Sequence, residues 1–220
     1  MTRMRQSIVG MAGAGLLCVS SPANAATINI MASVDGTVFV SGGVPLSGEQ
    51  NSEDTISQNV VPGQELRSVY EFDLPMLSEQ IVSATFIGSA VQNSAPPGVL
   101  SFFGYSGNGL FEIADAAQSS TLVGSATVPS AIPNGTFEPI AVPLTVSFIE
   151  ALGSGFLGLT TMAGDADTIT LASLESILGA RPTLRLETAA VPPPTAIPEP
   201  ATLLLLGGGL IGFAARRWQS

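Results

Sequence analysis

The sequence predicts an all-β domain, a single antiparallel β-sandwich of jelly-roll type, flanked by two hydrophobic ends. Between residues 26 and 188 helical periodicity is scarce. Short runs of Val, Ile, Thr and Phe recur there, and clusters of Gly, Pro, Ser and Asn separate them. Eight or so short strands with frequent turns favour a sandwich. No internal repeat is convincing, so residues 26–188 are predicted to form one domain.

The first 25 residues have the three-part plan of a secretory signal peptide. Two arginines precede an apolar run at residues 8–19, and small residues follow. Ala23 and Ala25 fit the positions that signal peptidase reads, so cleavage is expected after Ala25. About a dozen apolar residues are too few to span a bilayer, which takes about twenty. The lone Cys18 lies in this run behind Leu17, which disfavours a lipoprotein acceptor.

The strands of the domain are expected where β-branched and aromatic residues gather. Ile28, Ile30 and Val34 alternate on one face, and Asp35-Gly36 predicts a tight hairpin turn after them. Residues 169–178 fit either a strand or one helical turn. The polar residues 47–58 are expected to form a surface loop. Further strands are predicted at residues 67–74, 81–92, 99–105, 121–128, 137–148, 156–162 and 182–188.

The charge and composition exclude several classes of function. The formal net charge is −10, and the domain has only Arg67, Arg181 and Arg185 as cations. A domain with this much negative charge should repel the phosphate backbones of nucleic acids, which excludes nucleic-acid partners. The chain has no histidine and no lysine, and Cys18 leaves with the signal peptide. A Ser-His-Asp triad, a Schiff-base lysine and a histidine- or thiolate-bound zinc site are therefore excluded.

Paired carboxylates are the enzymatic route that remains. Glycoside hydrolysis uses two of them on either side of the scissile bond. Glu71 and Asp73 would share one face of a strand, and two other pairs occur, Asp165 with Asp167 and Glu53 with Asp54. Solvated surface charge is the competing interpretation of each pair, because an acidic chain produces such pairs by chance. We expect no enzyme, with a secreted glycoside hydrolase as the alternative.

Two ligand sites are predicted in the domain. Asp165 and Asp167 in "GDADT" offer oxygen ligands that suit Ca²⁺, although the full D-x-D-x-D-G loop is missing. No other cofactor is expected. Tyr105 in the glycine-rich "FFGYSGNG" is the candidate exposed aromatic for stacking on a glycan, and a turn tyrosine without a ligand is the alternative.

The carboxyl-terminal end has three parts in a fixed order. A proline-rich linker at residues 189–197 leads to Pro198-Glu199-Pro200, the uncharged residues 201–215 follow, and Arg216-Arg217 come next. Fifteen helical residues would cover about 22 Å, short of a hydrocarbon core of about 30 Å. The two arginines would hold this weak span on the cytoplasmic side and leave the domain outside.

Residues 198–220 resemble the PEP-CTERM sorting signal of Gram-negative bacteria. The resemblance implies recognition by an exosortase-type enzyme and cleavage in or beside Pro198-Glu199-Pro200. It also implies a transient stay in the inner membrane, then delivery to the cell surface or the extracellular polysaccharide matrix. An ordinary single-pass anchor is the alternative, which the short span disfavours.

A second resemblance concerns the domain itself. "ELRSVYEFDLPMLSEQIVSATFIGSAV" is similar to a stretch of DNRLRE-type domains, jelly rolls of secreted bacterial proteins, with Arg67 and the Phe72-Asp73-Leu74 run at the matching positions. The namesake hexapeptide is absent. The sequence thus favours an exported structural or adhesive protein with weak exopolysaccharide contacts. An anchored surface protein without any ligand is a further alternative.

Overall fold

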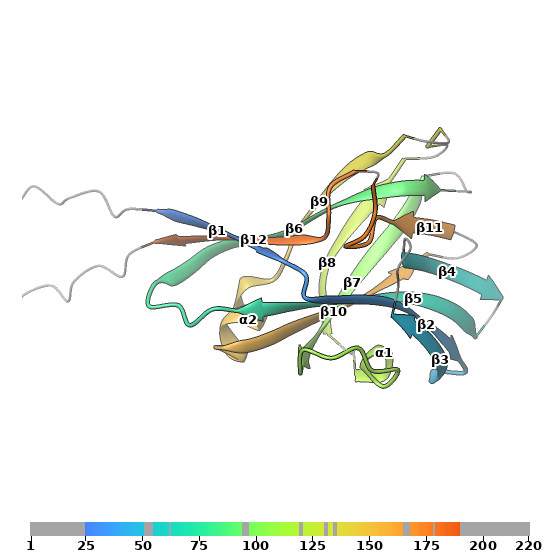
Figure 1. Ribbon diagram of the computed structural model, residues 1–220, viewed down its shortest axis with the longest axis horizontal. Helices are drawn as coiled ribbons and strands as arrows, with labels where there is room; N and C mark the ends of the chain where they lie inside the picture. The colour runs from blue at the N-terminus through green and yellow to red at the C-terminus, as the bar shows by residue number, and fades with distance from the viewer. Residues whose placement is uncertain are drawn as a thin grey trace, which may run out of the picture.

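The computed structural model describes residues 25–50, 55–61, 63–93, 97–118, 121–129, 132–133, 136–164, 168–177 and 179–189. Strands dominate these residues, and helices are few and short (Figure 1). In chain order the elements are β1 Ala26–Met31, β2 Val34–Ser41, β3 Val44–Gln50, β4 Thr55–Val61, β5 Gln64–Leu74, β6 Gln80–Asn93, β7 Gly98–Gly107, α1 Asp115–Gln118, β8 Thr121–Val128, β9 Glu138–Pro143, α2 Val146–Leu152, β10 Gly155–Ala163, β11 Thr168–Leu171 and β12 Thr183–Ala189.

The strands form one antiparallel ladder that folds over into two layers. Its order is β1-β12-β6-β11-β4-β5-β10-β7-β8, with β9 beside β6, and with β2 beside β5 and β3. In the core, the ring of Phe86 on β6 lies 5.6 Å from that of Tyr70 on β5 and 4.8 Å from that of Phe102 on β7. Because β6 is not hydrogen-bonded to β5 or β7, these contacts join two facing layers. The predicted all-β antiparallel sandwich is confirmed.

Alternating side chains build the core between the layers. On β12, Leu184 and Leu186 are buried while Arg185 and Glu187 are exposed, the period-two pattern of a strand with one solvated face. At one rim β8 and β9 lie close together, and the Thr145 N–H donates to the Val123 carbonyl (2.9 Å). The two layers therefore approach each other at this rim as well as through β4 and β11.

The hairpin predicted at Asp35-Gly36 is wrong, since both residues lie inside β2. The chain turns at Gly42 and Gly43, whose φ angles of 60° and 79° favour glycine. Asp35 has a different role, because its buried carboxylate accepts the N–H of Leu174 (2.9 Å). The turn signal was overridden by a contact with a residue far along the chain.

Two further expectations need correction. The loop expected at residues 47–58 is largely taken up by β3 and β4. The strand expected at 137–148 ends at Pro143, and α2 begins at Val146. Helical spacing explains this start, because Val146, Ile149 and Leu152 pack against the core. Residues 169–178 begin as a strand, with Ile169 and Leu171 buried on β11.

The first and last strands of the domain are neighbours. Ala26 on β1 pairs with Thr188 on β12, so the described chain starts and ends at the same end of the sandwich (Figure 1). Within the described residues, no helix has the length and apolar character needed to cross a bilayer. The candidate span at 201–215 lies outside those residues.

Candidate functional site

The outer face of the β5-containing layer carries a row of four residues in register. Val34 pairs with Glu71, Glu71 with Gly158, and Gly158 with Tyr105, across β2, β5, β10 and β7. Gly158 leaves room for its neighbour, because a Cβ there would overlap the ring of Tyr105. The tyrosine ring lies over this glycine, and its hydroxyl donates to Glu71 Oε1 (3.1 Å).

The Glu71 carboxylate is fully enclosed, with an exposed fraction of 0%. Its other oxygen, Oε2, accepts the N–H of Gly109 (2.5 Å). Gly107 stands directly against the carboxylate, since a Cβ at that position would lie 2.5 Å from Oε1. The "GYSGNG" run that suggested an exposed turn thus folds over an acid from another strand.

Residues 108–118, here called the strap, continue from β7 through α1 and cover this face (Figure 1). Phe111 of the strap packs against a second apolar cluster, which lies apart from the main core. Gly36 and Gly48 make the space for it, because a Cβ at Gly36 would overlap the Phe111 ring and one at Gly48 would touch it at 3.1 Å. The cluster consists of Val38, Val40, Val69, Tyr105 and Ala116.

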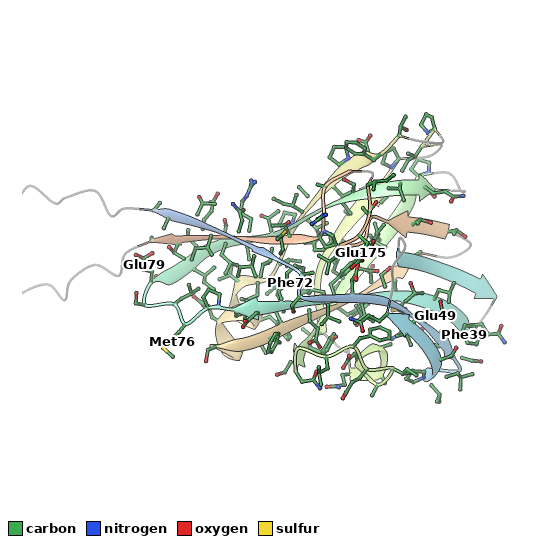
Figure 2. All side chains as sticks on the ribbon, in the orientation of Figure 1. Phe39, Glu49, Phe72, Met76, Glu79 and Glu175 are labelled. Carbon is green, nitrogen blue, oxygen red and sulfur yellow. The ribbon has the colours of Figure 1, made fainter. Side chains whose placement is uncertain are left out.

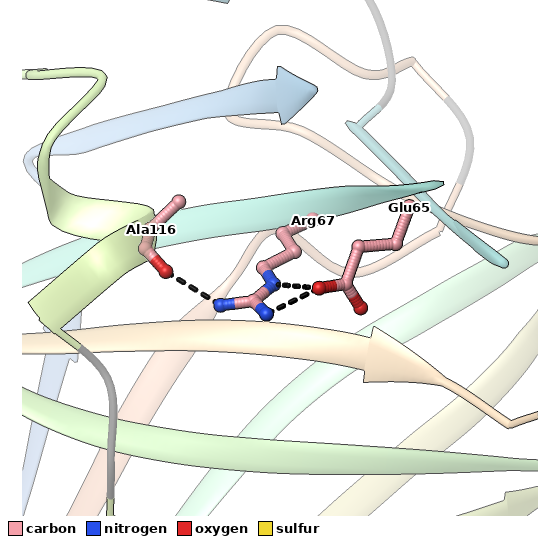
Figure 3. Close-up of polar contacts among 3 residues, drawn as sticks. All are labelled: Glu65, Arg67 and Ala116. Atoms are coloured by element: carbon pink, nitrogen blue, oxygen red, sulfur yellow. Dashed lines mark hydrogen bonds and ion pairs between the residues drawn. The ribbon is translucent and has the colours of Figure 1, made fainter. Parts of the chain in front are cut away.

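Arg67 fixes the other end of the strap. Its Nη1 donates to the Ala116 carbonyl of α1 (2.5 Å), and its Nε donates to Glu65 Oε1 (3.0 Å) (Figure 3). Nη2 of Arg67 forms an ion pair with the same Glu65 oxygen. Two residues of β5 therefore hold the strap. Glu71 binds it at Gly109, and Arg67 binds it at Ala116.

Burial sets the proton affinity of the groups beneath the strap. Burial raises the pKa of Glu71, and the negative charge of Asp115 adds to the rise, while the Gly109 N–H and the Tyr105 hydroxyl oppose it. Burial also raises the pKa of Tyr105, and the Glu71 charge raises it further. Burial raises the pKa of Asp115, whose Oδ2 accepts the Glu112 N–H (2.8 Å). The cluster can hold protons, but it is closed to solvent.

The expectation that Tyr105 presents an exposed ring is wrong. Only 4% of the residue is exposed, and its hydroxyl is engaged by Glu71. Its ring lies on Gly158 and cannot stack on a sugar from outside. Among the described residues, Phe137 before β9 is the aromatic that is exposed, at 46%.

Glu71 and Asp73 do not form an accessible pair. Both side chains project from the outer face of β5. The strap covers Glu71, whereas Asp73 is exposed outside the strap. Tyr105, Gly107 and Gly109 surround the Glu71 carboxylate and occupy the space that a substrate would need. This face serves to attach the strap.

The other predicted site residues lie outside the described part of the chain. These are Asp165 and Asp167, Glu53 and Asp54, Ala23, Pro198-Glu199-Pro200 and Arg216-Arg217. Ala25 is the first described residue and is exposed. Within the described residues, no group of three or more acidic or sulfur side chains could hold a metal ion. Calcium binding at Asp165 and Asp167 stays a prediction.

Sequence reasoning missed Asp115 and the role of Arg67. Asp115 heads a four-residue helix that periodicity cannot reveal, and the sequence assigned Arg67 to a strand and to the DNRLRE-like stretch without a contact partner. The one available signal was the density of glycines at residues 104–109, which indicates close approach of other groups.

Comparisons with known proteins identify the end of the chain. Residues 196–217 match the family model of the PEP-CTERM protein-sorting motif. The chain carries a PEP-CTERM sorting motif. The match contains Pro198-Glu199-Pro200, the uncharged span and Arg216-Arg217, which are the parts singled out from the sequence. The PEP-CTERM motif indicates an exported protein that an exosortase sorts to the envelope or surface of a Gram-negative cell.

The same comparisons say less about the domain. No curated protein matches the chain. Among solved structures, the Eiger TNF of S. frugiperda is similar over 80% of this chain and 98% of its own, with 15% identity and a TM-score of 0.25. The resemblance to DNRLRE-type domains stays a prediction.

Proposed function

We propose that the sandwich works without catalysis, as a structural or adhesive module at the cell surface or in the extracellular matrix. Its contacts with exopolysaccharide are weak, made by exposed side chains at the rims of the sandwich. Signal peptidase removes residues 1–25, and an exosortase-type enzyme releases the domain from its transient place in the inner membrane.

The enclosure of Glu71 carries this proposal. Glu71 has the environment most typical of a catalytic acid, because it is buried and its pKa is raised, yet its carboxylate binds the strap. Some exposed apolar residues, in contrast, lie on β3 and β8, which each pair with a single strand, and in the segment before β9, where a flat polymer can reach them. They include Val44 and Leu46 on β3, Leu122 on β8, and Phe137.

Co-sedimentation of the secreted protein with exopolysaccharide from its own host tests the proposal. The protein should bind and release no new reducing ends. Phe137→Ala should weaken binding about tenfold, since an aromatic face is a strong contact for a sugar ring. Leu122→Ala, a control at another exposed apolar position, should change it less. Binding that is the same in both variants would overturn the role of Phe137.

A glycoside hydrolase is the second candidate. The raised pKa of Glu71 favours it, because a general acid must keep its proton near neutral pH. This reading requires the strap to open. Product release that disappears in Glu71→Gln would establish the hydrolase and refute the non-catalytic proposal, whereas binding without turnover would refute the hydrolase.

A further inference from the structure

A cavity of about 370 Å³ opens between the β5–β6 connection and the end of α2. Its walls are largely apolar, and Glu79 and Glu150 add two carboxylates. Met76 stands at this site with 88% of its surface exposed, which is unusual for a large apolar side chain. The apolar lining comes from Met76, Leu77, Ile81 and Ile149.

The cavity adjoins the last described residues before the sorting tail. Ile81 in its wall pairs with Thr188, and the Thr188 hydroxyl donates to the Glu79 carboxylate. Ala189, the last residue of β12, pairs with Gln80. Figure 2 shows Met76 and Glu79 at the end of the sandwich where β1 begins and β12 ends, with Glu49 far away near the opposite end.

Chain geometry limits how far the sorting motif can lie from this cavity. Eight residues, 190–197, separate Ala189 from Pro198, the first proline of the Pro-Glu-Pro motif. The nine Cα-to-Cα steps from Ala189 to Pro198 span at most about 32 Å when the chain is fully extended. A small protein domain is about 30 Å across. An enzyme of that size that binds the motif can therefore reach the cavity.

We propose that this cavity is a second contact site for the enzyme that processes the sorting tail, in addition to the Pro-Glu-Pro motif. The proposal rests on the sorting assignment above. The partner inserts an apolar side chain into the cavity and places a lysine or arginine against Glu150. Methionine suits such a contact because its flexible thioether adapts to the shape of a partner. Carboxylates at the site favour a cationic protein over an anionic membrane surface.

The test compares processing rates of full-length chains in the native host. Met76→Asp with Glu150→Arg changes two exposed positions, so the fold should persist. Ile177→Asp with Glu175→Arg makes the matched change in the segment after β11, away from the cavity (Figure 2). Pulse-chase with intact mass follows loss of Trp218. The first variant should be processed about tenfold more slowly, the effect of losing one good interface contact, and the control at the parental rate.

Equal rates in both double variants would overturn the contact site while leaving the sorting assignment intact. A parental chain that keeps Trp218 would overturn the sorting assignment and the contact site together. The milder Met76→Ala with Glu150→Gln, together with the melting temperature of each secreted domain, separates slow processing from misfolding. Binding of the purified domain to anionic vesicles, lost in the first variant, would assign the site to lipid and contradict a protein partner.

Discussion

Glu71 owes its properties to its neighbours in the sheet. Gly158 on one side and Gly107 above it leave a space that Tyr105 and Gly109 fill with hydrogen-bond donors. Within the part of the chain that the structure describes, its carboxylate forms no ion pair. Burial therefore dominates, and the pKa of Glu71 is raised. An acid with a raised pKa in the folded state makes folding more favourable as protons are taken up.

The free energy of unfolding should consequently rise as the pH falls from 7.5 toward 4.5, the ordinary value for glutamate. Above the folded pKa both states are ionised, and the cost of burying the charge is present in full. As the pH passes downward through the folded pKa, the folded state binds a proton first and that cost disappears. Urea unfolding at a series of pH values measures the effect.

Glu71→Gln should flatten this rise and leave the part due to Asp115, whose pKa is also raised. Glu49→Gln, at an exposed position on β3, should follow the parental curve. A parental protein that loses stability as the pH falls over this range would contradict the burial of an acid without a cationic partner. A Glu71→Gln curve parallel to the parental curve would contradict it as well.

Thr160 offers a second test at a single residue. Its side chain on β10 is fully buried, and its hydroxyl has no hydrogen-bond partner among the described residues. Thr160→Val removes this unsatisfied group with almost no change of shape, so it should stabilise the domain by about 1 kcal/mol. Thr145→Val is the control, because that hydroxyl donates to the Val123 carbonyl (3.1 Å) and its loss should cost about 1 kcal/mol.

Among the elements, the strap depends on contacts that are few and far apart in sequence. Gly109, Phe111 and Ala116 attach it to β5, β2 and β3. Its own helix, α1, has four residues and cannot be stable alone. Local opening of such a segment costs less free energy than unfolding the sheet beneath it.

Phe111→Ala should therefore make the strap open more often. Losing half-buried aromatic surface costs about 2 kcal/mol, less than the 3–5 of a fully buried phenylalanine. Cleavage within residues 108–118 by a non-specific protease should then speed up more than tenfold. Leu110→Ala is the matched control, since Leu110 is exposed on the same segment. Cleavage of the variant elsewhere first would show that the strap is not the weakest element.

Elements that depend on local contacts were predicted from the sequence, whereas elements that depend on contacts distant in sequence were not. β8 was predicted with the bounds it has, since "TLVGSATV" carries its own alternation and its own flanking polar residues. The hairpin prediction at Asp35-Gly36 was wrong because these residues contact Leu174 and Phe111, which are distant in sequence. Glu71 and Tyr105 were each singled out, but their meeting depends on the register of β5, β10 and β7. No local pattern encodes that register.

For the whole molecule, the sorting tail decides the location of the domain. Deleting residues 197–220 removes the matched motif and leaves the sandwich intact, since its last strand ends at Ala189. The truncated chain should be exported but lose its surface localisation, and appear in the soluble fraction. Cell fractionation with an antibody against the domain measures this. Unchanged surface localisation would show that the tail is dispensable.

The pairing of β1 with β12 has a consequence for export. The predicted signal peptide implies translocation with the amino terminus first, so that β1 crosses before all other strands, yet its hydrogen-bonding partner β12 is the last strand to emerge. The edge of β6 that receives β12 stays open until then. Folding thus cannot finish vectorially. The native sandwich closes only when the final residues of the domain have left the translocon, by which time the tail that follows is entering the channel.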